Sequence, residues 1–316
     1  MSFFGGGTDA LKYIEGSGWG AVLSTTVQSY VYVAISRNFY GNVRAYYTGA
    51  FEAVKNVGEL QNKYIREILK SAGIENGVDV YVTTDSVAKG GGLGGSAALM
   101  VGLLNSAHAF MGKRKGPAEL EAEATRLGTD KNGIGDTTGR QDQAAAAFGG
   151  FNVMKFFRDG RVEAEPLKCG RETLGTLEGR LVQFYLGGSR SASEILFRQE
   201  KKIADELELR TELRSQVDVG RRLLEAGKLD DFGKLLNGAW ELKKRISGVS
   251  NPEIDKYYAS ALKAGALGGK LSGAGGTGFL LFYCPDGTKD GVRKALSGLK
   301  EVSLKFEPRG TTLATV

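Results

Sequence analysis

The pattern of apolar and polar residues predicts a chain that mixes strands and helices. Segments rich in Val, Thr, Tyr and Phe, several with apolar and polar positions in alternation, predict strands. They lie at residues 21–36 (two strands or one long bent strand), 78–84, 151–157, 161–168, 181–186, 278–284 and 302–306. Helical spacing predicts helices at residues 96–111, 117–128 and 192–246, and a further one from Asn251-Pro252 onward. We therefore expect an α+β fold.

The segment at residues 170–179, which contains several glycines, marks the expected division of the chain. A chain of 316 residues can form one large domain or two closely packed ones. We expect an N-terminal domain at residues 1–170 and a C-terminal domain at residues 171–316.

Composition excludes several classes of protein. No apolar run approaches the ~20 residues that cross a bilayer, and the residues after Met1 do not resemble a secretory signal. We therefore expect a cytoplasmic protein with no membrane partner. The single histidine, His108, argues against His-based triads and His-rich metal sites. Cys169 and Cys284 lack metal-ligand spacing; one disulfide between them is conceivable, but reduced, buried thiols are expected.

The net charge of +6 is compatible with a small anionic partner. Basic residues are scattered among acidic ones, as on a solvated helix surface, and do not form the patch that nucleic acid requires. We therefore expect no nucleic-acid partner, and self-association into a homo-oligomer stays open.

Glycine is unusually frequent, with 47 residues, roughly twice the average usage, and the glycines are clustered. The largest cluster, Lys89-Gly90-Gly91-Gly92-Leu93-Gly94-Gly95-Ser96-Ala97, lies between a predicted strand and a predicted helix. Because glycine has no Cβ atom, this backbone can approach an anion closely. The following helix points its free N–H groups and the positive end of its dipole at the same place. The segment therefore predicts a phosphate site.

Two better-known phosphate loops fit this segment less well. A P-loop ends in Gly-Lys-Ser/Thr, whereas this loop ends in Gly95-Ser96-Ala97. Gly90, Gly92 and Gly95 satisfy the GxGxxG pattern of dinucleotide binding. However, the dinucleotide-binding fold requires a second strand that ends in an acidic residue at about this distance, and residues 117–128 are helical instead. A Rossmann-type oxidoreductase is thus an outside alternative.

Three further segments resemble ligand-binding turns. Gly139-Arg140-Gln141-Asp142-Gln143 enters an Ala-rich helix and suggests a carboxylate held beside a cation, although by itself it could simply be a helix start. A second segment, Lys270-Leu271-Ser272-Gly273-Ala274-Gly275-Gly276-Thr277-Gly278, precedes an apolar strand. A third, Phe4-Gly5-Gly6-Gly7-Thr8-Asp9, lies near the first residue. Dense glycine at four places argues for backbone that closes around ligands.

Taken in order, these segments resemble the GHMP kinase superfamily, and within it the D-glycero-D-manno-heptose 7-phosphate kinases. The likeness continues through Arg190-Ser191-Ala192-Ser193-Glu194, Ala239-Trp240-Glu241-Leu242-Lys243-Lys244 and Ser250-Asn251-Pro252-Glu253, so it covers nearly the whole chain. It implies a two-domain GHMP kinase fold, with an N-terminal ribosomal-protein-S5-like α/β domain and a C-terminal ferredoxin-like α+β domain. It also implies ATP and Mg²⁺ as cofactors and a small sugar phosphate as substrate.

The resemblance implies a role for each matching residue. ATP is expected at Lys89, Gly90, Gly91, Gly92, Leu93, Gly94, Gly95, Ser96 and Ala97, and Mg²⁺ at Ser96 and Asp130. Asp142 is expected to act as general base or orienting charge, and Arg140 to offset charge on the transferring phosphoryl group. The sugar phosphate is expected at Gly6, Gly7, Thr8, Asp9, Arg190, Gly275 and Gly276.

The expected reaction is transfer of the ATP γ-phosphate to the anomeric hydroxyl of a heptose 7-phosphate. A kinase for mannose, fucose or galactose is a second enzyme hypothesis, and a non-catalytic ATP- or sugar-binding relative is a third. The third rests on departures from the family pattern. Gly95 replaces a usual serine, Asp130 a usual glutamate, and Asn62 a common histidine.

Overall fold

The computed structural model describes residues 1–85, 92–136, 139–187, 201–246 and 248–314. Packing divides the chain into two compact units, each drawn from separate stretches of sequence. The first unit comprises Met1–Gln28, Ala88–Leu93 and Gly150–Pro308, and the second comprises Ser29–Val87, Gly94–Gly149 and Arg309–Val316. The predicted boundary near residue 170 stays a prediction, because these units group residues by packing and interleave along the chain.

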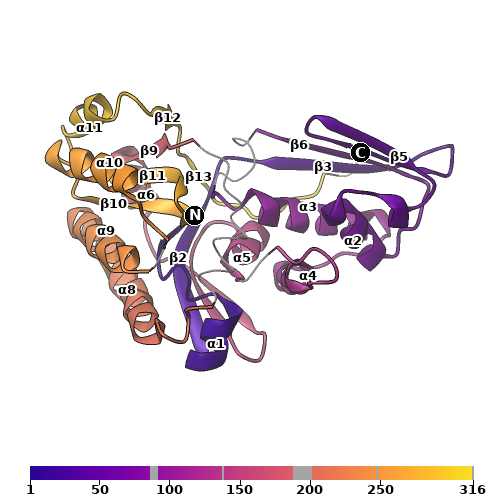
Figure 1. Cartoon of the computed structure of the whole chain (residues 1–316), viewed down its shortest axis with the longest axis horizontal. Coiled ribbons are helices and arrows are strands. Elements are labelled where there is room, and N and C mark those ends of the chain that lie inside the picture. The colour runs from indigo at the N-terminus through magenta and orange to yellow at the C-terminus, as the bar shows by residue number, and fades with distance from the viewer. Residues whose placement is uncertain (86–91, 137–138, 188–200, 247, 315–316) are drawn as a thin grey trace. The chain divides into compact units, whose positions relative to one another are not determined.

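The second unit is a four-stranded sheet with helices on one face (Figure 1). The strand order is β3 (Val31–Arg37), β6 (Val78–Thr84), β4 (Val43–Tyr47) and β5 (Ala50–Val54). Only β4 and β6 are parallel among these neighbours. The helices are α2 (Lys63–Ala72), α3 (Gly95–Phe110), α4 (Pro117–Thr129) and α5 (Gln141–Phe148), and Val57–Glu59 forms a short 3₁₀ helix.

The core of the second unit lies between its sheet and its helices. Val43 and Val80 from the strands pack with Ile68, Leu103 and Leu120 from α2, α3 and α4, and all five are buried. This apolar layer fixes the start of α3, which carries the predicted phosphate site.

The first unit contains two antiparallel sheets. One has the order β1 (Ser2–Phe4), β2 (Trp19–Val27), β7 (Phe151–Phe157) and β8 (Val162–Pro166), and β13 (Phe306–Glu307) also pairs with β2. The other has the order β10 (Gly268–Gly275), β11 (Thr277–Tyr283), β9 (Leu181–Tyr185) and β12 (Lys300–Val302). The helices are α1 (Leu11–Ser17), α6 (Arg171–Arg180), α8 (Leu207–Glu225), α9 (Leu229–Lys244), α10 (Pro252–Lys263) and α11 (Lys289–Ala295).

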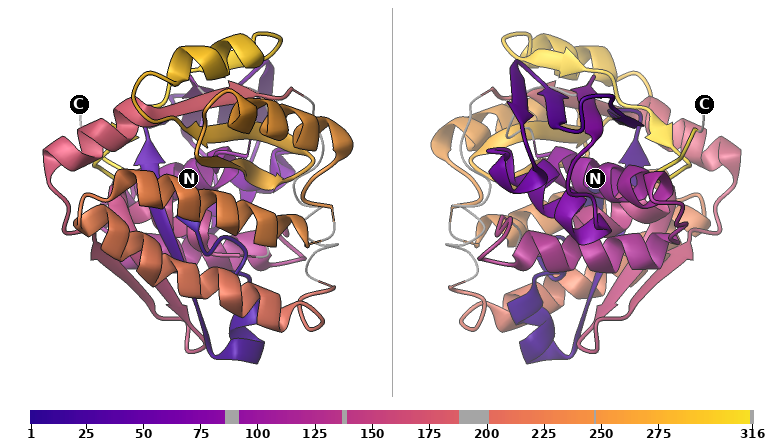
Figure 2. Two further views of the ribbon diagram at one scale, coloured as in Figure 1. Left: turned by 90° about the vertical axis from the view of Figure 1, so that its left-hand side faces the viewer. Right: turned by 90° about the vertical axis from the view of Figure 1, so that its right-hand side faces the viewer.

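Helices α8 and α9 lie side by side and pack on both sheets of the first unit (Figure 2). Phe4 and Leu23 from β1 and β2 are buried in one cluster with Val217 of α8 and Phe232 of α9. This packing brings the segment after β1, which contains Gly6 to Asp9, next to the two helices.

Most of the predicted elements are confirmed. Residues 21–36 form β2 and β3, which belong to different sheets. The helical stretch 192–246 is interrupted at residues 226–228, between α8 and α9, and residues 192–200 lie outside the described residues. The single strand predicted at 302–306 is wrong, because Val302 ends β12 and Phe306 begins β13. Residues at the expected boundary form helix α6.

The structure shows how far the two cysteines and the histidine are buried. Cys169 and Cys284 are free thiols. Cys284 is buried as expected, whereas Cys169 is partly exposed, so the expectation of burial is wrong for Cys169. Burial raises the pKa of Cys284 to about 11. His108 is buried, and its Nε2 atom lies 2.8 Å from Glu123 Oε2.

Candidate active site

The predicted phosphate loop leads into the start of α3. Gly94 adopts the left-handed conformation with φ of 77°, and no side chain caps the helix. The first-turn N–H groups of a helix lack intrahelical acceptors, so they and the helix dipole favour an anion. Ser96 is exposed in this turn. Lys89, Gly90 and Gly91 lie outside the described residues.

Asp142 lies directly beside this helix start. It belongs to the first turn of α5, and α5 packs against α3. A Cβ atom added to Gly94 would lie 3.3 Å from Asp142 Cγ and 3.6 Å from Asp142 Oδ2. The carboxylate, predicted from the sequence as a catalytic group, is therefore next to the predicted phosphate site within the second unit.

Arg140 is held in a buried ion pair. Its Nε donates to Glu121 Oε1 at 3.0 Å and its Nη2 donates to Glu121 Oε2 at 2.7 Å. The Arg140 and Glu121 side chains are 5% and 1% exposed. Arg140 also precedes α5, where its carbonyl oxygen accepts the Ala144 N–H. These contacts fix the start of the helix that carries Asp142, and the expected contact of Arg140 with a phosphoryl group stays a prediction.

The structure contains a polar cluster next to Ser96 that the sequence analysis did not predict. The Tyr64 hydroxyl donates to Asp136 Oδ2 at 2.6 Å, and Lys63 Nζ donates to Asp136 Oδ1 at 2.6 Å. Burial and the hydrogen bond to Asp136 raise the pKa of Tyr64, and a hydrogen bond with Ser96 opposes that rise. Tyr64 therefore links Asp136 to the serine that is expected to meet Mg²⁺.

Asp130, the other predicted metal ligand, follows α4. Its Oδ1 accepts the Asn132 N–H at 2.9 Å, so the exposed carboxylate caps the turn after the helix. In the described part of the chain, no three acidic, histidine or cysteine side chains gather to hold a metal ion. The role of Asp130 stays a prediction.

In the first unit, the predicted sugar-binding turn is rigidly held. The fully buried Thr8 Oγ1 lies 2.8 Å from the carbonyl oxygens of Gly5 and Ala21, and it accepts the Ala21 N–H. Asp9, which is 4% exposed, accepts the Gly7 N–H through Oδ1 at 3.1 Å. Thr8 thus anchors the turn to β2, and the expected sugar contacts of both residues stay predictions.

The glycine-rich turn between β10 and β11 approaches the end of the phosphate loop. A Cβ atom on Gly92 would lie 2.6 Å from the Cα of Gly273, so glycine permits this close backbone contact. Beyond it, the Gly276 N–H donates to the Val249 carbonyl at 3.1 Å, and Gly275 lies against the same segment. Two segments singled out from the sequence are therefore in contact. Arg190 lies outside the described residues.

Comparison with known proteins decides the family. The GHMP kinases N terminal domain matches residues 57–150, and the GHMP kinases C terminal domain matches residues 221–302. The chain is 31% identical over 314 residues to D-glycero-alpha-D-manno-heptose 7-phosphate kinase of Campylobacter jejuni. This match covers 94% of the chain and 90% of that protein. The chain belongs to the GHMP kinase family.

Other relatives agree with this membership. A mevalonate kinase of Methanothermobacter thermautotrophicus is 28% identical over 78% of the chain and 78% of its own length. The solved structure of a D-glycero-D-manno-heptose 1-phosphate kinase from Bacteroides thetaiotaomicron superposes with a TM-score of 0.80. It covers 100% of the chain and 97% of its own length at 23% identity, so it shows the shared two-domain fold.

As a GHMP kinase, the chain is an ATP-dependent small-molecule kinase. The predicted fold class, the mixed α+β GHMP architecture, is therefore confirmed. No helix within the described residues is long and apolar enough to cross a membrane.

Proposed function

We propose that this GHMP kinase transfers the γ-phosphate of ATP to the anomeric hydroxyl of D-glycero-D-manno-heptose 7-phosphate, which gives the 1,7-bisphosphate. The observation that carries the kinase chemistry is the contact of Asp142 with the start of α3 at Gly94. The relative from Campylobacter jejuni, named as a heptose 7-phosphate kinase, supports the choice of acceptor.

Phosphoryl transfer needs positioning and charge neutralisation more than covalent chemistry. In the proposed step, the anomeric oxygen forms a bond to the γ-phosphorus while the bond from that phosphorus to the β,γ-bridging oxygen breaks. The electron pair of the broken bond leaves with ADP, and the hydroxyl proton passes by way of Asp142 to solvent. The N–H groups at the start of α3, which begins at Gly95, hold phosphate oxygens.

The residues beside α3 fit a magnesium ion that is shared with ATP. Mg²⁺ in kinases is commonly held by one or two protein oxygens together with substrate phosphates, so a three-acid cluster is not required. Ser96 supplies a hydroxyl in the first turn of α3, and Tyr64 connects that hydroxyl to Asp136. We propose that Ser96 holds the ion together with Asp130. When bound, Mg²⁺ offsets the charge of the transferring phosphate oxygens.

Turnover on defined acceptors tests the proposal. ADP release is measured with Mg²⁺-ATP over heptose 7-phosphate, the unphosphorylated heptose, mannose, fucose and galactose, and the product is identified by phosphorus NMR. We expect turnover on heptose 7-phosphate with a new anomeric phosphate. We also expect a loss of about 10²–10⁴-fold in kcat for Asp142→Asn.

Binding of ATP provides the control for that variant. Asp142→Asn should keep the rise in melting temperature that ATP produces, because the carboxylate acts on the acceptor. Turnover on an unphosphorylated sugar, with none on heptose 7-phosphate, would show that the proposed acceptor is wrong. ATP binding without turnover on any sugar would favour a non-catalytic relative.

A further inference from the structure

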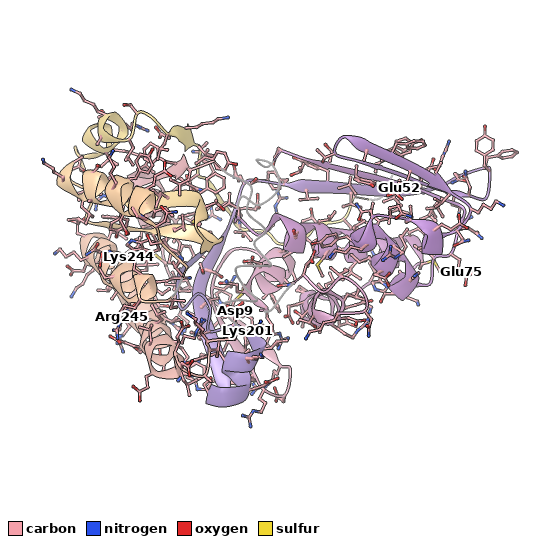
Figure 3. All side chains as sticks on the ribbon, viewed as in Figure 1. Asp9, Glu52, Glu75, Lys201, Lys244 and Arg245 are labelled. Carbon is pink, nitrogen blue, oxygen red and sulfur yellow. The ribbon has the colours of Figure 1, made fainter. Side chains whose placement is uncertain are left out.

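Among the described residues, helices cover only one face of the sheet of the second unit (Figure 1). Val43, Val78 and Val80 point into the core on that side, so the residues that alternate with them lie on the opposite side. Figure 3 shows side chains that project from this opposite side, and it labels Glu52 on the edge strand β5. We call this surface the outer face, and its outward side chains are Tyr32, Ala34, Ser36, Arg44, Tyr46, Phe51, Ala53, Asp79, Tyr81 and Thr83.

Three stacked aromatic rings cross the outer face from strand to strand. Tyr81 on β6 lies opposite Tyr46 on β4, and Tyr46 lies opposite Phe51 on β5. The ring centroids of Tyr46 and Tyr81 are 4.6 Å apart with an interplanar angle of 4°, and those of Tyr46 and Phe51 are 4.7 Å apart at 35°. Because β4 lies between β5 and β6, the Tyr46 ring has a neighbour on each of its faces. The row therefore presents ring edges outward.

The side chains of the outer face add up to no net charge. Arg44 and Asp79 are its charged members, and Arg44 Nε donates to Asp79 Oδ1 at 2.7 Å. Arg44 Cζ also lies 5.6 Å from the centre of the Tyr40 ring, and Tyr40 meets Phe39 edge to face with 5.8 Å between the ring centroids. The aromatic surface thus continues from the strands into the loop between β3 and β4, which contains Phe39 and Tyr40.

The exposed area of the aromatic residues is large for a protein that acts alone. Tyr32, Phe51 and Tyr81 are 54%, 56% and 43% exposed, and Phe39 and Tyr40 are 97% and 74% exposed. At about 200 Å² for a whole aromatic side chain, these five residues leave roughly 650 Å² in contact with solvent. The largest apolar patch on a typical monomer is about 300–600 Å², whereas each partner in a stable complex buries about 800 Å². The five residues alone thus supply most of the area of one side of such an interface.

The chemistry of the outer face favours a protein partner over a nucleic acid or a carbohydrate. Nucleic acid needs cations that neutralise its phosphates, and the charge of Arg44 is already offset by Asp79. A base or a sugar ring stacks on an open aromatic face, but both faces of the Tyr46 ring are covered by Tyr81 and Phe51. Aromatic residues with few charges are typical of the centre of a protein interface.

We infer that two copies of this chain pair through the outer face and form a two-fold symmetric dimer. A face without net charge does not repel its own copy, and two-fold symmetry lets the same surface serve both partners. Two sheets that pack face to face lie about 10 Å apart, with their strands within about 30° of each other. In that arrangement the ring edges of Tyr46, Phe51 and Tyr81 meet aromatic side chains of the other copy, and edge-to-face contacts are favoured between aromatic rings. The inference goes beyond the proposed function and does not depend on which sugar is phosphorylated.

Sedimentation velocity of the full chain at increasing protein concentration tests the inference. We expect the wild type to form a particle of twice 33.7 kDa. Phe51→Arg places an unpaired charge in the interface, so it should weaken dimerisation by about 30-fold or more. Phe39→Arg changes a residue that is almost fully exposed, which leaves the fold intact, and it should weaken dimerisation by about tenfold. Met111→Arg adds the same charge at an exposed position at the end of α3, on the helix side of the sheet, and this variant should dimerise as the wild type does.

A wild type that stays monomeric at every concentration would overturn the inference. A dimer that neither Phe51→Arg nor Phe39→Arg weakens, or one that Met111→Arg weakens equally, would also overturn it, because the contact would then lie elsewhere. If a monomeric wild type binds an oligonucleotide or an oligosaccharide and Phe51→Arg abolishes that binding, the outer face belongs to that ligand instead. Melting temperatures of the variants identify any loss of folding, and Phe39→Arg decides the question if Phe51→Arg does not fold.

Discussion

The Asp142 carboxylate lies against Gly94, the residue that precedes α3, and a Cβ atom on residue 94 would come within 3.3 Å of Asp142 Cγ. Gly94 has a left-handed φ of 77°, a conformation that costs other residues roughly 1–2 kcal/mol. Glycine at this position therefore serves two purposes. It ends the loop in the required conformation, and it leaves space for the carboxylate beside the positive end of the helix.

Alanine substitutions at Gly94 and Gly95 should have different effects on stability. Gly94→Ala should lower the free energy of unfolding by about 1–2 kcal/mol because of the positive φ. It should also reduce kcat, because the new methyl group displaces Asp142. Gly95 lies within α3 with open space around its Cα, so Gly95→Ala should be neutral or should stabilise by up to about 1 kcal/mol. Urea unfolding of the two variants measures the difference. Equal free energies of unfolding would contradict this account of Gly94.

The buried pair of Arg140 and Glu121 should behave as a coupled unit. Arg140→Met or Glu121→Met alone leaves one buried charge without its partner, and each should cost about 3–5 kcal/mol. The double variant should lose much less than the sum of the two, because apolar side chains of similar length can pack in place of the pair. Urea unfolding of the four proteins gives the coupling energy.

Kinetics of the same proteins separate two roles of Arg140. If Arg140 only positions α5, the double variant should recover kcat along with stability. If its guanidinium also meets the transferring phosphoryl group, kcat should stay low in a folded double variant. We expect the second outcome, since the resemblance assigns that contact to Arg140. Full recovery of kcat in the double variant would remove Arg140 from the proposed mechanism.

Local signals in the sequence were enough to predict many of the elements that carry the site. The start of α3 was predictable because the glycines and the apolar helix pattern adjoin each other. Helix α2 was missed, although Ile65, Ile68, Leu69 and Ala72 follow helical spacing and the side chain of Asn62 caps its first turn. Asn62 drew attention only as a departure from the family pattern, and its helix-capping contacts with Tyr64 and Ile65 explain the residue structurally.

Contacts between distant residues could not be predicted from the sequence. No periodicity indicates that Tyr64 meets Asp136, or that Asp142 comes to rest against Gly94, because both contacts depend on how α2, α3 and α5 pack. Thr8 is a further example. The ligand contact that its motif suggested stays a prediction, and nothing in the sequence indicated that its buried hydroxyl would lie against two backbone carbonyl oxygens and anchor its own turn.

The link from Ser96 through Tyr64 to Asp136 should control the response to magnesium. Chelation of Mg²⁺ should abolish turnover, and Ser96→Ala should raise the Mg²⁺ concentration for half-maximal activity by about tenfold or more, through loss of a direct ligand. Tyr64→Phe should produce a smaller rise, of about three- to tenfold, because it removes only an orienting hydroxyl. Activity measured against Mg²⁺ concentration at fixed ATP tests the order. A larger effect of Tyr64→Phe than of Ser96→Ala would contradict the assignment of Ser96 as ligand.

Acid should weaken the sheet of the second unit through Asp79. Arg44 on β4 and Asp79 on β6 are directly opposite each other in the parallel register, and Arg44 Nε donates to Asp79 Oδ1 at 2.7 Å. The hydrogen bond from Arg44 holds the pKa of Asp79 below its usual value of about 3.9. Because the pKa of Asp79 is lower in the folded state than in the unfolded state, the unfolded state binds more protons at pH values between these two pKa values. The stabilisation is complete above the unfolded-state pKa and is lost as pH falls through the folded-state pKa. Asp79→Asn should therefore have a lower urea midpoint than the wild type at pH 6, and the difference should shrink as pH falls toward 3. A constant difference over that range would show that the Asp79 charge contributes nothing to stability.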